Sequence, residues 1–291
     1  MSRYERRPAV AGYFYPSGRD ALINDIEAQF LSPLGPGSLP KVNVDGPRNI
    51  LGLISPHAGY MYSGPIASHG YYHLASDGFP DKIIIIGPNH SGVGAAISVY
   101  PGGVWHLPLG DVYVDEDFVE KLVGAEPYIA LDADAHSYEH SIEVQIPFLQ
   151  YIYSLADKEF RIIPIVMMQQ TWSAVDTLGS ALSKVLEDYP RESYLIIAST
   201  DFSHYEPSTE AEKRDRYVIE RILDMDPQGV IDMVYRYDVS MCGYGPVATL
   251  LYVASSLGAS KSVLLKYGSS GDITGDYSSV VAYASFKVVW K

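Results

Sequence analysis

The chain has 291 residues, of which 47% are hydrophobic, and it carries a formal net charge of −14. This acidity argues against general nucleic-acid binding, because the field of such a protein repels phosphate groups. There is no run of about 20 apolar residues to cross a membrane, and no apolar segment of signal-peptide length follows the basic N-terminus. The single cysteine, Cys242, excludes an intrachain disulfide and a four-cysteine zinc site. We therefore expect a cytoplasmic protein that binds neither nucleic acid nor membrane.

Apolar periodicity and turn residues predict an alternation of helices and strands. In the first half we expect, in order, a helix at 18–31, a surface loop at 32–49, a strand at 50–54, a helix from Pro65 to about 75, strands at 83–86 and 96–100, and helices at 115–123 and 138–154. In the second half we expect a strand at 160–166, a helix at 172–188, a strand at 194–198, helices at 208–223, 227–236 and 247–257, and strands at 262–267 and 279–290.

The strand at 83–86 consists of four isoleucines, a pattern that indicates burial on both faces. The fold class that this alternation predicts is α/β, as a single domain over residues 1–291. We expect a three-layer α/β/α sandwich whose central sheet is mostly parallel and ends in antiparallel strands from the C-terminal part of the chain.

Three of the buried strands lead directly into polar residues. The strand at 50–54 runs into His57, the strand at 83–86 into Asn89 and His90, and the strand at 194–198 into Asp201 and His204. Open α/β sheets bind ligands beyond the carboxyl ends of their strands, so we expect these side chains to share one rim.

Cys242 follows the predicted helix at 227–236 and could join that rim. Two imidazoles and a thiolate are good ligands for Fe(II), zinc or copper, so His57, His90 and Cys242 are candidate metal ligands. The alternative is that each is satisfied separately, with Cys242 as a small buried hydrophobe. Cys242 could also act as a nucleophile of depressed pKa beside a histidine.

The remaining candidates each have a structural alternative. Asp201 and His204 could form a proton-transferring pair, or Asp201 could stabilise a turn while His204 is solvated. Asn89 could hold a substrate oxygen or stabilise a turn.

Two further pairs of histidines lie four residues apart. His136 and His140 lack a metalloprotease signature, so capping and surface polarity are the favoured interpretation, although His140 and Glu143 are kept as rim candidates. His69 and His73 are interpreted as surface residues.

At these residues the chain resembles the Memo family (mediator of ErbB2-driven cell motility), in its prokaryotic form. The matching motifs span the chain and are RPAVAGYFYP at 7–16, PHAGY at 56–60, GPNH at 87–90, HSYEHSIE at 136–143, STDFSHY at 199–205 and Cys242-Gly243. The resemblance implies a fold like that of the class III extradiol dioxygenases, which cleave catechol rings with non-haem iron. It also places the metal at His57, His90 and Cys242, with Asp201 and His204 lining the same pocket. As further pocket residues we expect Asn89, His140, Glu143 and Tyr60.

The resemblance to the ring-cleaving enzymes breaks at the third ligand. They use two histidines and a carboxylate, whereas this sequence has Cys242, whose thiolate is softer and oxidises readily. Dioxygenase activity therefore does not follow from the fold.

The leading hypothesis is a protein with an Fe(II) centre, with copper or zinc as alternatives, that carries out redox chemistry on a small, for example aromatic, substrate. Asp201 and His204 would then be the catalytic pair. The second hypothesis is a non-catalytic binding protein that holds a peptide or small anion in the same pocket, with no metal. A zinc- or cysteine-dependent hydrolase is a third hypothesis. No pattern in the sequence indicates the oligomeric state.

Overall fold

A twelve-stranded sheet runs through the protein, which is described here over residues 4–290 by a computed structural model. The main path of the sheet has the order β1-β5-β6-β8-β3-β9-β2-β12-β10, with β11 beside β12, and β4 linking β7 to β8. The strands are β1 (Glu5–Arg6), β2 (Ile50–Ser55), β3 (Lys82–Pro88), β4 (Ile97–Val99), β5 (Val104–Leu107), β6 (Gly110–Val114), β7 (Ile129–Leu131), β8 (Arg161–Met167), β9 (Tyr194–Ser199), β10 (His204–Glu206), β11 (Lys261–Ser269) and β12 (Val280–Val289).

The centre of the sheet is parallel, as the sequence predicted. β3 lies between β8 and β9, and Ile84 is in register with Ile163 on one side and Ile196 on the other. All three isoleucines are fully buried. Both faces of β3 are therefore covered, which explains its unbroken apolar run. β2 continues the parallel set beyond β9, so β3, β9 and β2 end at one edge.

Antiparallel strands complete the sheet, as predicted for the C-terminal part of the chain. β12 pairs antiparallel with β2, β10 and β11. A hairpin of β5 and β6 forms the other side, where the sequence indicated no strands.

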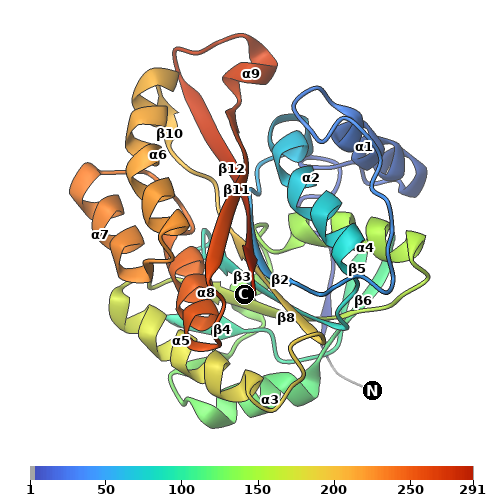
Figure 1. The fold of residues 1–291 in the computed structure, drawn as a ribbon. Helices are drawn as coiled ribbons and strands as arrows, with labels where there is room; N and C mark the ends of the chain where they lie inside the picture. The colour runs from blue at the N-terminus through green and yellow to red at the C-terminus, as the bar shows by residue number, and fades with distance from the viewer. Residues whose placement is uncertain (1–3, 291) are drawn as a thin grey trace.

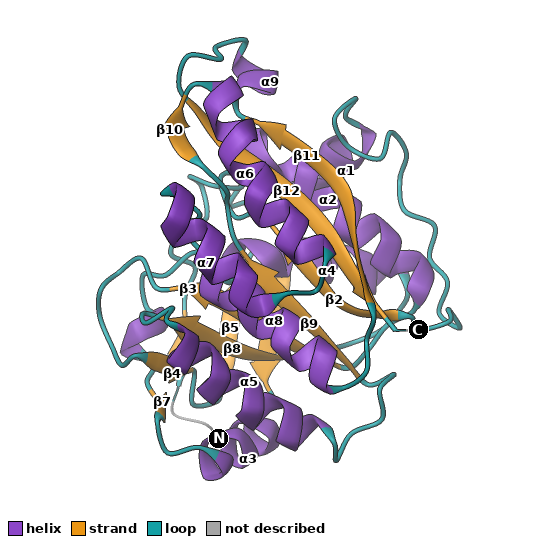
Figure 2. Cartoon of the chain, turned by 60° about the vertical axis from the view of Figure 1, so that its left-hand side comes forward, coloured by secondary structure: helices purple, strands orange, loops and turns teal. Residues whose placement is uncertain are grey.

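Helices cover both faces of the sheet (Figures 1 and 2). α2 packs on β2 and β12 together with α1 and α4, while α8 packs on β9, β2 and β3 on the other face, beside α5 and α7. The helices are α1 (Arg19–Leu31), α2 (Tyr60–Asp77), α3 (Glu116–Ala125), α4 (Ile146–Leu155), α5 (Trp172–Leu186), α6 (Ser208–Leu223), α7 (Pro227–Tyr237), α8 (Tyr244–Ser256) and α9 (Gly271–Thr274), with 3₁₀ turns η1 (Asp134–His136) and η2 (Glu143–Gln145). Among the described residues no helix combines the length and the apolar character needed to cross a bilayer.

Two predicted helix starts were wrong. α2 begins at Tyr60 with Gly59 as its N-cap, five residues before Pro65, so Pro65 lies inside the helix and not at its start. The helix expected from 138 begins only at Ile146. The segment before it is held in an irregular form by hydrogen bonds from its buried side chains, and it passes across the end of β3. There Gly87 packs so tightly against Ser141 that a side chain at Gly87 would overlap the Ser141 hydroxyl.

Candidate functional site

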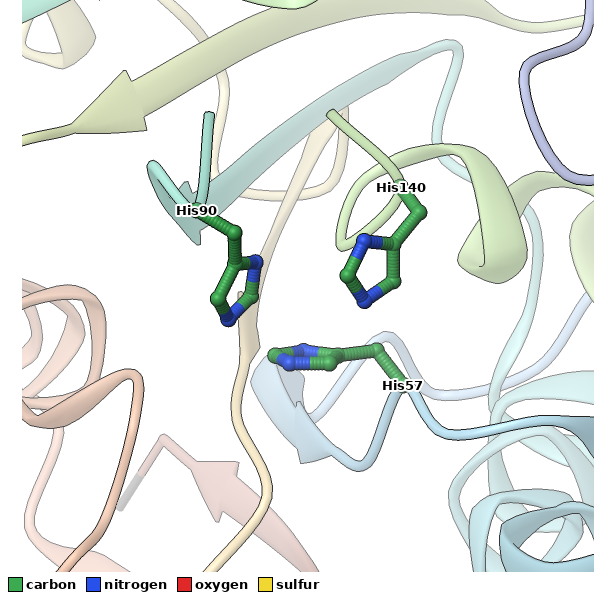
Figure 3. Close-up of side chains that lie close together, drawn as sticks. All are labelled: His57, His90 and His140. Atoms are coloured by element: carbon green, nitrogen blue, oxygen red, sulfur yellow. The ribbon is translucent and has the colours of Figure 1, made fainter. Parts of the chain in front are cut away.

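Three histidines meet at the carboxyl edge of the parallel strands (Figure 3). His57 follows β2, His90 follows β3, and His140 lies in the irregular segment before η2. One ring nitrogen from each lies within 4.8 Å of the others, an arrangement that could hold a metal ion. The rings of His90 and His140 stack with centroids 4.8 Å apart, and the ring of His57 stands edge-on to both.

Hydrogen bonds fix the tautomer of His57, which is buried. Its Nδ1 lies 2.8 Å from the hydroxyl of Ser199. That hydroxyl donates its single proton to the carbonyl of Ser141, at 2.7 Å, and accepts from the amide of Gln145, at 2.8 Å. The Ser199 hydroxyl can then only accept from His57, so Nδ1 of His57 carries the proton and Nε2 presents a lone pair to the cluster.

Glu139 fixes the tautomer of His90 in the same way. Its buried carboxylate accepts from Nδ1 of His90 at 3.0 Å, from the backbone N–H of His90 at 2.5 Å, and from the backbone N–H of Ser141 at 2.8 Å. Nε2 of His90 is therefore free to face the cluster. A carboxylate behind a histidine is the usual outer partner of a metal-binding imidazole, because it orients the ring and makes it more basic.

Burial and charge separate the pKa values of these groups. Burial, followed by the neighbouring imidazoles, lowers the pKa of His57 well below 6.5, and burial also lowers that of His140. Burial lowers the pKa of His90 as well, but the hydrogen bond and charge of Glu139 outweigh it, so this pKa is raised. At neutral pH His57 and His140 are thus neutral and can offer lone pairs.

Cys242 lies in contact with His57. Its Sγ is 3.2 Å from Nε2 of His57 and accepts from the backbone N–H of Asp201, also at 3.2 Å. Burial and the nearby carboxylate of Asp201 raise the pKa of the Cys242 thiol. A raised pKa disfavours the activated-nucleophile interpretation, since the protein by itself does not stabilise the thiolate.

Asp201 and His204 lie beside this cluster without bonding to each other through their side chains. The carboxylate of Asp201 accepts from the backbone N–H of His57 at 2.8 Å and so holds the loop of that histidine. Burial raises its pKa to about 6, against the opposing effect of this hydrogen bond and of the His204 charge. His204 is half-buried, and its Nδ1 donates to the carbonyl of Ser240 at 2.8 Å, so in the neutral ring the lone pair is on Nε2.

Three other predicted pocket residues are occupied by structural contacts. The side chain of Asn89 bonds within its own turn, to Ser91, Gly92 and Val93. The Tyr60 hydroxyl donates to the carbonyl of Val144 at 2.7 Å. The buried carboxylate of Glu143 pairs with Arg6 and also accepts from Ala9, Val10 and Tyr15, so it anchors the N-terminal segment.

The surface interpretation was wrong for His136. His136 is fully buried against Tyr100 and Trp105, and burial lowers its pKa to about 3. His69 and His73 are half-buried on α2 rather than exposed. The spacing of these histidines could not indicate their burial, because it does not show which residues pack on a polar face.

Glu139, Ser199 and Gln145 had no assigned role in the sequence. Glu139 and Ser199 fall inside the matching motifs at 136–143 and 199–205, which was the only available signal. Their role depends on bonds to residues 49 and 142 positions away in the chain, which no local pattern reveals.

The donor set fits a metal ion with small adjustment. Imidazole nitrogens at about 2.1 Å from a tetrahedral ion are about 3.4 Å apart, so the outermost pair here would close by roughly 1.4 Å, a change within reach of ring rotation. A thiolate and an imidazole that share one ion are about 3.6 Å apart, close to the 3.2 Å between Cys242 and His57. His140 belongs to the same cluster of ring nitrogens as His57 and His90, whereas Cys242 is brought to the site by its contact with His57.

Fold and site together define a class, namely α/β proteins with a histidine-lined, metal-capable centre at the carboxyl edge of a parallel sheet. The profile of Memo-like proteins matches residues 6–287, and the chain belongs to this family. It is 48% identical over 281 residues to a MEMO1 family protein of Methanopyrus kandleri, covering 97% of this chain and 98% of the relative. Relatives from Sulfurisphaera tokodaii and Methanocaldococcus jannaschii, also MEMO1 family proteins, are each 47% identical. They cover 97% and 96% of this chain, and 98% and 97% of their own lengths.

Proposed function

We propose that this protein binds one metal ion, iron, at His57 and His90, and acts on a small substrate there. The observation that carries the proposal is the convergence of two Nε2 lone pairs whose Nδ1 atoms are each engaged by an outer partner, Ser199 or Glu139. Metal-binding histidines are organised in this way. Copper and zinc suit the same donors, and the choice of iron rests on the dioxygenase-like fold that the family resemblance implies.

The third protein ligand is Cys242 or His140. The pKa of the Cys242 thiol is raised, so Cys242 would bind an ion only with loss of its proton. The ion would then have to stabilise the thiolate, because the protein by itself does not. His140 is neutral and needs no deprotonation. Binding through Cys242 therefore strengthens steeply with pH, whereas binding through His140 does not.

Bound iron would supply redox chemistry that the side chains cannot perform. His204 would accept a proton from the substrate at Nε2, since its Nδ1 proton is committed to the Ser240 carbonyl. Asp201 would keep the His57 loop in place and favour the charged form of His204 once the proton has arrived.

The test is elemental analysis of protein purified anaerobically without a metal-affinity tag. We expect close to one ion per chain in the wild type and loss of the ion in a His57→Ala, His90→Ala double variant. Cys242→Ser and His140→Ala identify the third ligand, because only the true ligand's removal releases the ion. His106→Ala is the matched control, since His106 pairs with Asp111 on the β5–β6 hairpin and should not affect metal content.

The contrary result is a wild type that contains no metal and binds none of Fe(II), Cu(I) or zinc on titration. That result would exclude the metal centre and leave the binding of a peptide or small anion as the function to test. For a metal-loaded protein with measurable turnover, His204→Ala should abolish turnover and retain the ion. Unchanged turnover would remove His204 from the mechanism.

A further inference from the structure

A groove with two unpaired lysines lies beside α2, where this helix packs along the paired strands β11 and β12 (Figure 1). The groove has a volume of about 560 Å³, which suits a small organic molecule. Its lining includes Lys261 of β11, Lys287 of β12 and His73 of α2. Neither lysine forms an ion pair with a described residue, and the ring nitrogens of His73 make no hydrogen bond to one.

Strand register sets the two lysines side by side. Lys261 is in register with Val289, and Lys287 is in register with Val263. The two lysines are thus diagonal neighbours on one face of the strand pair, about 7–8 Å apart. Two flexible side chains at this spacing can bring their ammonium groups to a single small anion.

That face of the strand pair points toward α2. Ser285, two residues before Lys287 on β12, has its hydroxyl against Gly70 of α2. Lys287 therefore projects from the same face, toward the next turn of the helix, which carries His73. In agreement, burial and then the charge of Lys287 lower the pKa of His73. At neutral pH His73 is mostly uncharged, so the two lysines supply the positive charge of the groove.

The negative groups at the end of α2 already have partners. The buried carboxylate of Asp77 pairs with Arg48 at 3.2 Å and accepts from the backbone N–H groups of Asn49 and Ile50, at 2.9 and 2.8 Å. The backbone carbonyl of Asp77 accepts from the backbone N–H of Arg48 at 2.8 Å. The charges of the groove that lack a counter-charge are therefore those of the lysines.

Packing does not explain a lysine at position 287. The residue is half-buried on a strand that is paired on both sides, with Leu53 of β2 and Val263 of β11. An unpaired ammonium at such a position loses hydration without gaining a partner, whereas a methionine would cover the same apolar surface without that cost. Salt screens charges that lie more than about 8–10 Å away, so the lysines, and not the net charge of −14, set the local potential.

We propose that this groove binds a small phosphate monoester, with its phosphate between Lys261 and Lys287 and its organic group against Val263, Val289 and Trp290. A phosphate monoester carries close to two negative charges at neutral pH, which matches two ammonium groups. Each ammonium donates in three directions, as a tetrahedral oxyanion requires, whereas a planar carboxylate is better matched by the fork of an arginine.

The groove lies at the opposite end of β2 from the histidine centre. Ile50 in its lining is the first residue of β2, and His57 follows the last, roughly 20 Å farther along the strand. The inference therefore goes beyond the proposed metal function and does not depend on it. The His57→Ala, His90→Ala double variant should bind a phosphate monoester like the wild type.

The experiment measures the affinity of hexyl phosphate by titration calorimetry at low salt. We expect Lys261→Met and Lys287→Met each to bind about 10-fold more weakly than the wild type, because each loses one charge-assisted hydrogen bond. Lys287→Arg keeps the charge and should retain most of the affinity. The unfolding midpoints of the methionine variants should not fall, since no ion pair within the protein is removed. Hexanol, which has no charge, should not compete with hexyl phosphate.

Lys184→Met is the matched control. Lys184 is exposed on α5, on the other face of the sheet, and forms no ion pair with a described residue. This variant should bind hexyl phosphate like the wild type. A wild type that binds neither hexyl phosphate nor inorganic phosphate would overturn the assignment. So would methionine variants of Lys261 and Lys287 that bind as tightly as the wild type.

A lipid headgroup could present the same phosphate monoester. Phosphatidylcholine vesicles that contain phosphatidic acid distinguish this source from a soluble ligand. We expect no cosedimentation of the wild type with these vesicles, because the net charge of −14 repels an anionic bilayer. Cosedimentation that is lost in Lys287→Met would overturn the choice of a soluble ligand.

Discussion

Replacing Glu139 with glutamine tests the organisation of the site most directly. One carboxylate oxygen accepts from Nδ1 of His90 and from the backbone N–H of Ser141, and the other accepts from the backbone N–H of His90. Glutamine has one acceptor oxygen, so its NH₂ group must face at least one of these donors inside the protein. In the better orientation, the glutamine oxygen still accepts from Nδ1 of His90 and from the backbone N–H of Ser141. The NH₂ group then faces the backbone N–H of His90, which donates to the carboxylate at 2.5 Å in the wild type, so this hydrogen bond is lost.

The expected cost follows from this count. Losing a buried hydrogen bond to a charged acceptor, with a donor left unpaired, costs about 1–3 kcal/mol of unfolding free energy. Loss of the outer partner of His90 should weaken zinc binding about 10- to 100-fold. Denaturant unfolding of the metal-free protein measures the first effect, and competition with a chromophoric chelator measures the second.

Glu210→Gln is the control for Glu139→Gln. Glu210 is exposed on α6 and makes only a 3.9 Å ion pair with Lys213, so its change should leave both quantities unaltered. If Glu139→Gln behaved like Glu210→Gln, Glu139 would not organise His90. A loss of stability without any loss of zinc affinity would show a structural role only.

Three other substitutions test the packing and ionisation around the site. Burial raises the pKa of Asp215 to about 6, so its pKa in the folded protein exceeds the unfolded value of 3.8. The protonated carboxyl therefore contributes fully to the free energy of unfolding below pH 4, and this contribution falls by about 3 kcal/mol as the pH rises through 6. Asp215→Asn should remove that decline in urea unfolding at pH 4 and pH 7, and an unchanged pH dependence would show that Asp215 ionises freely. Glu143→Gln leaves Arg6 buried beside a neutral amide and should cost about 3–5 kcal/mol, with faster proteolysis near the N-terminus; wild-type stability would contradict the anchoring role. Gly52→Ala should lower the free energy of unfolding by about 1–3 kcal/mol, because the new Cβ would lie 2.5 Å from Cδ1 of Leu250 and 2.9 Å from the Ile196 carbonyl oxygen. Gly124→Ala is the control and should be neutral or stabilising, because a Cβ there would meet no atom within 4 Å.

The apolar runs of the sequence predicted the central parallel strands and the edge at which the site lies, but not the β5–β6 hairpin. Fully apolar runs such as Ile83 to Ile86 are only stable in strands that are covered on both faces, and parallel strands bring their carboxyl ends to one edge. The positions of His57 and His90 at that edge follow from these two rules. Asp201 and His204 follow the buried strand at 194–198 and were predicted at the same edge by the same argument.

The arrangement of the side chains at that edge depends on long-range contacts in the folded protein. Glu139, four residues from Glu143, orients His90, whereas Glu143 anchors Arg6, because the segment that carries both is irregular and not helical. Such roles depend on contacts between residues far apart in the chain. Local periodicity reports burial and secondary structure, but it does not specify which buried group will meet which.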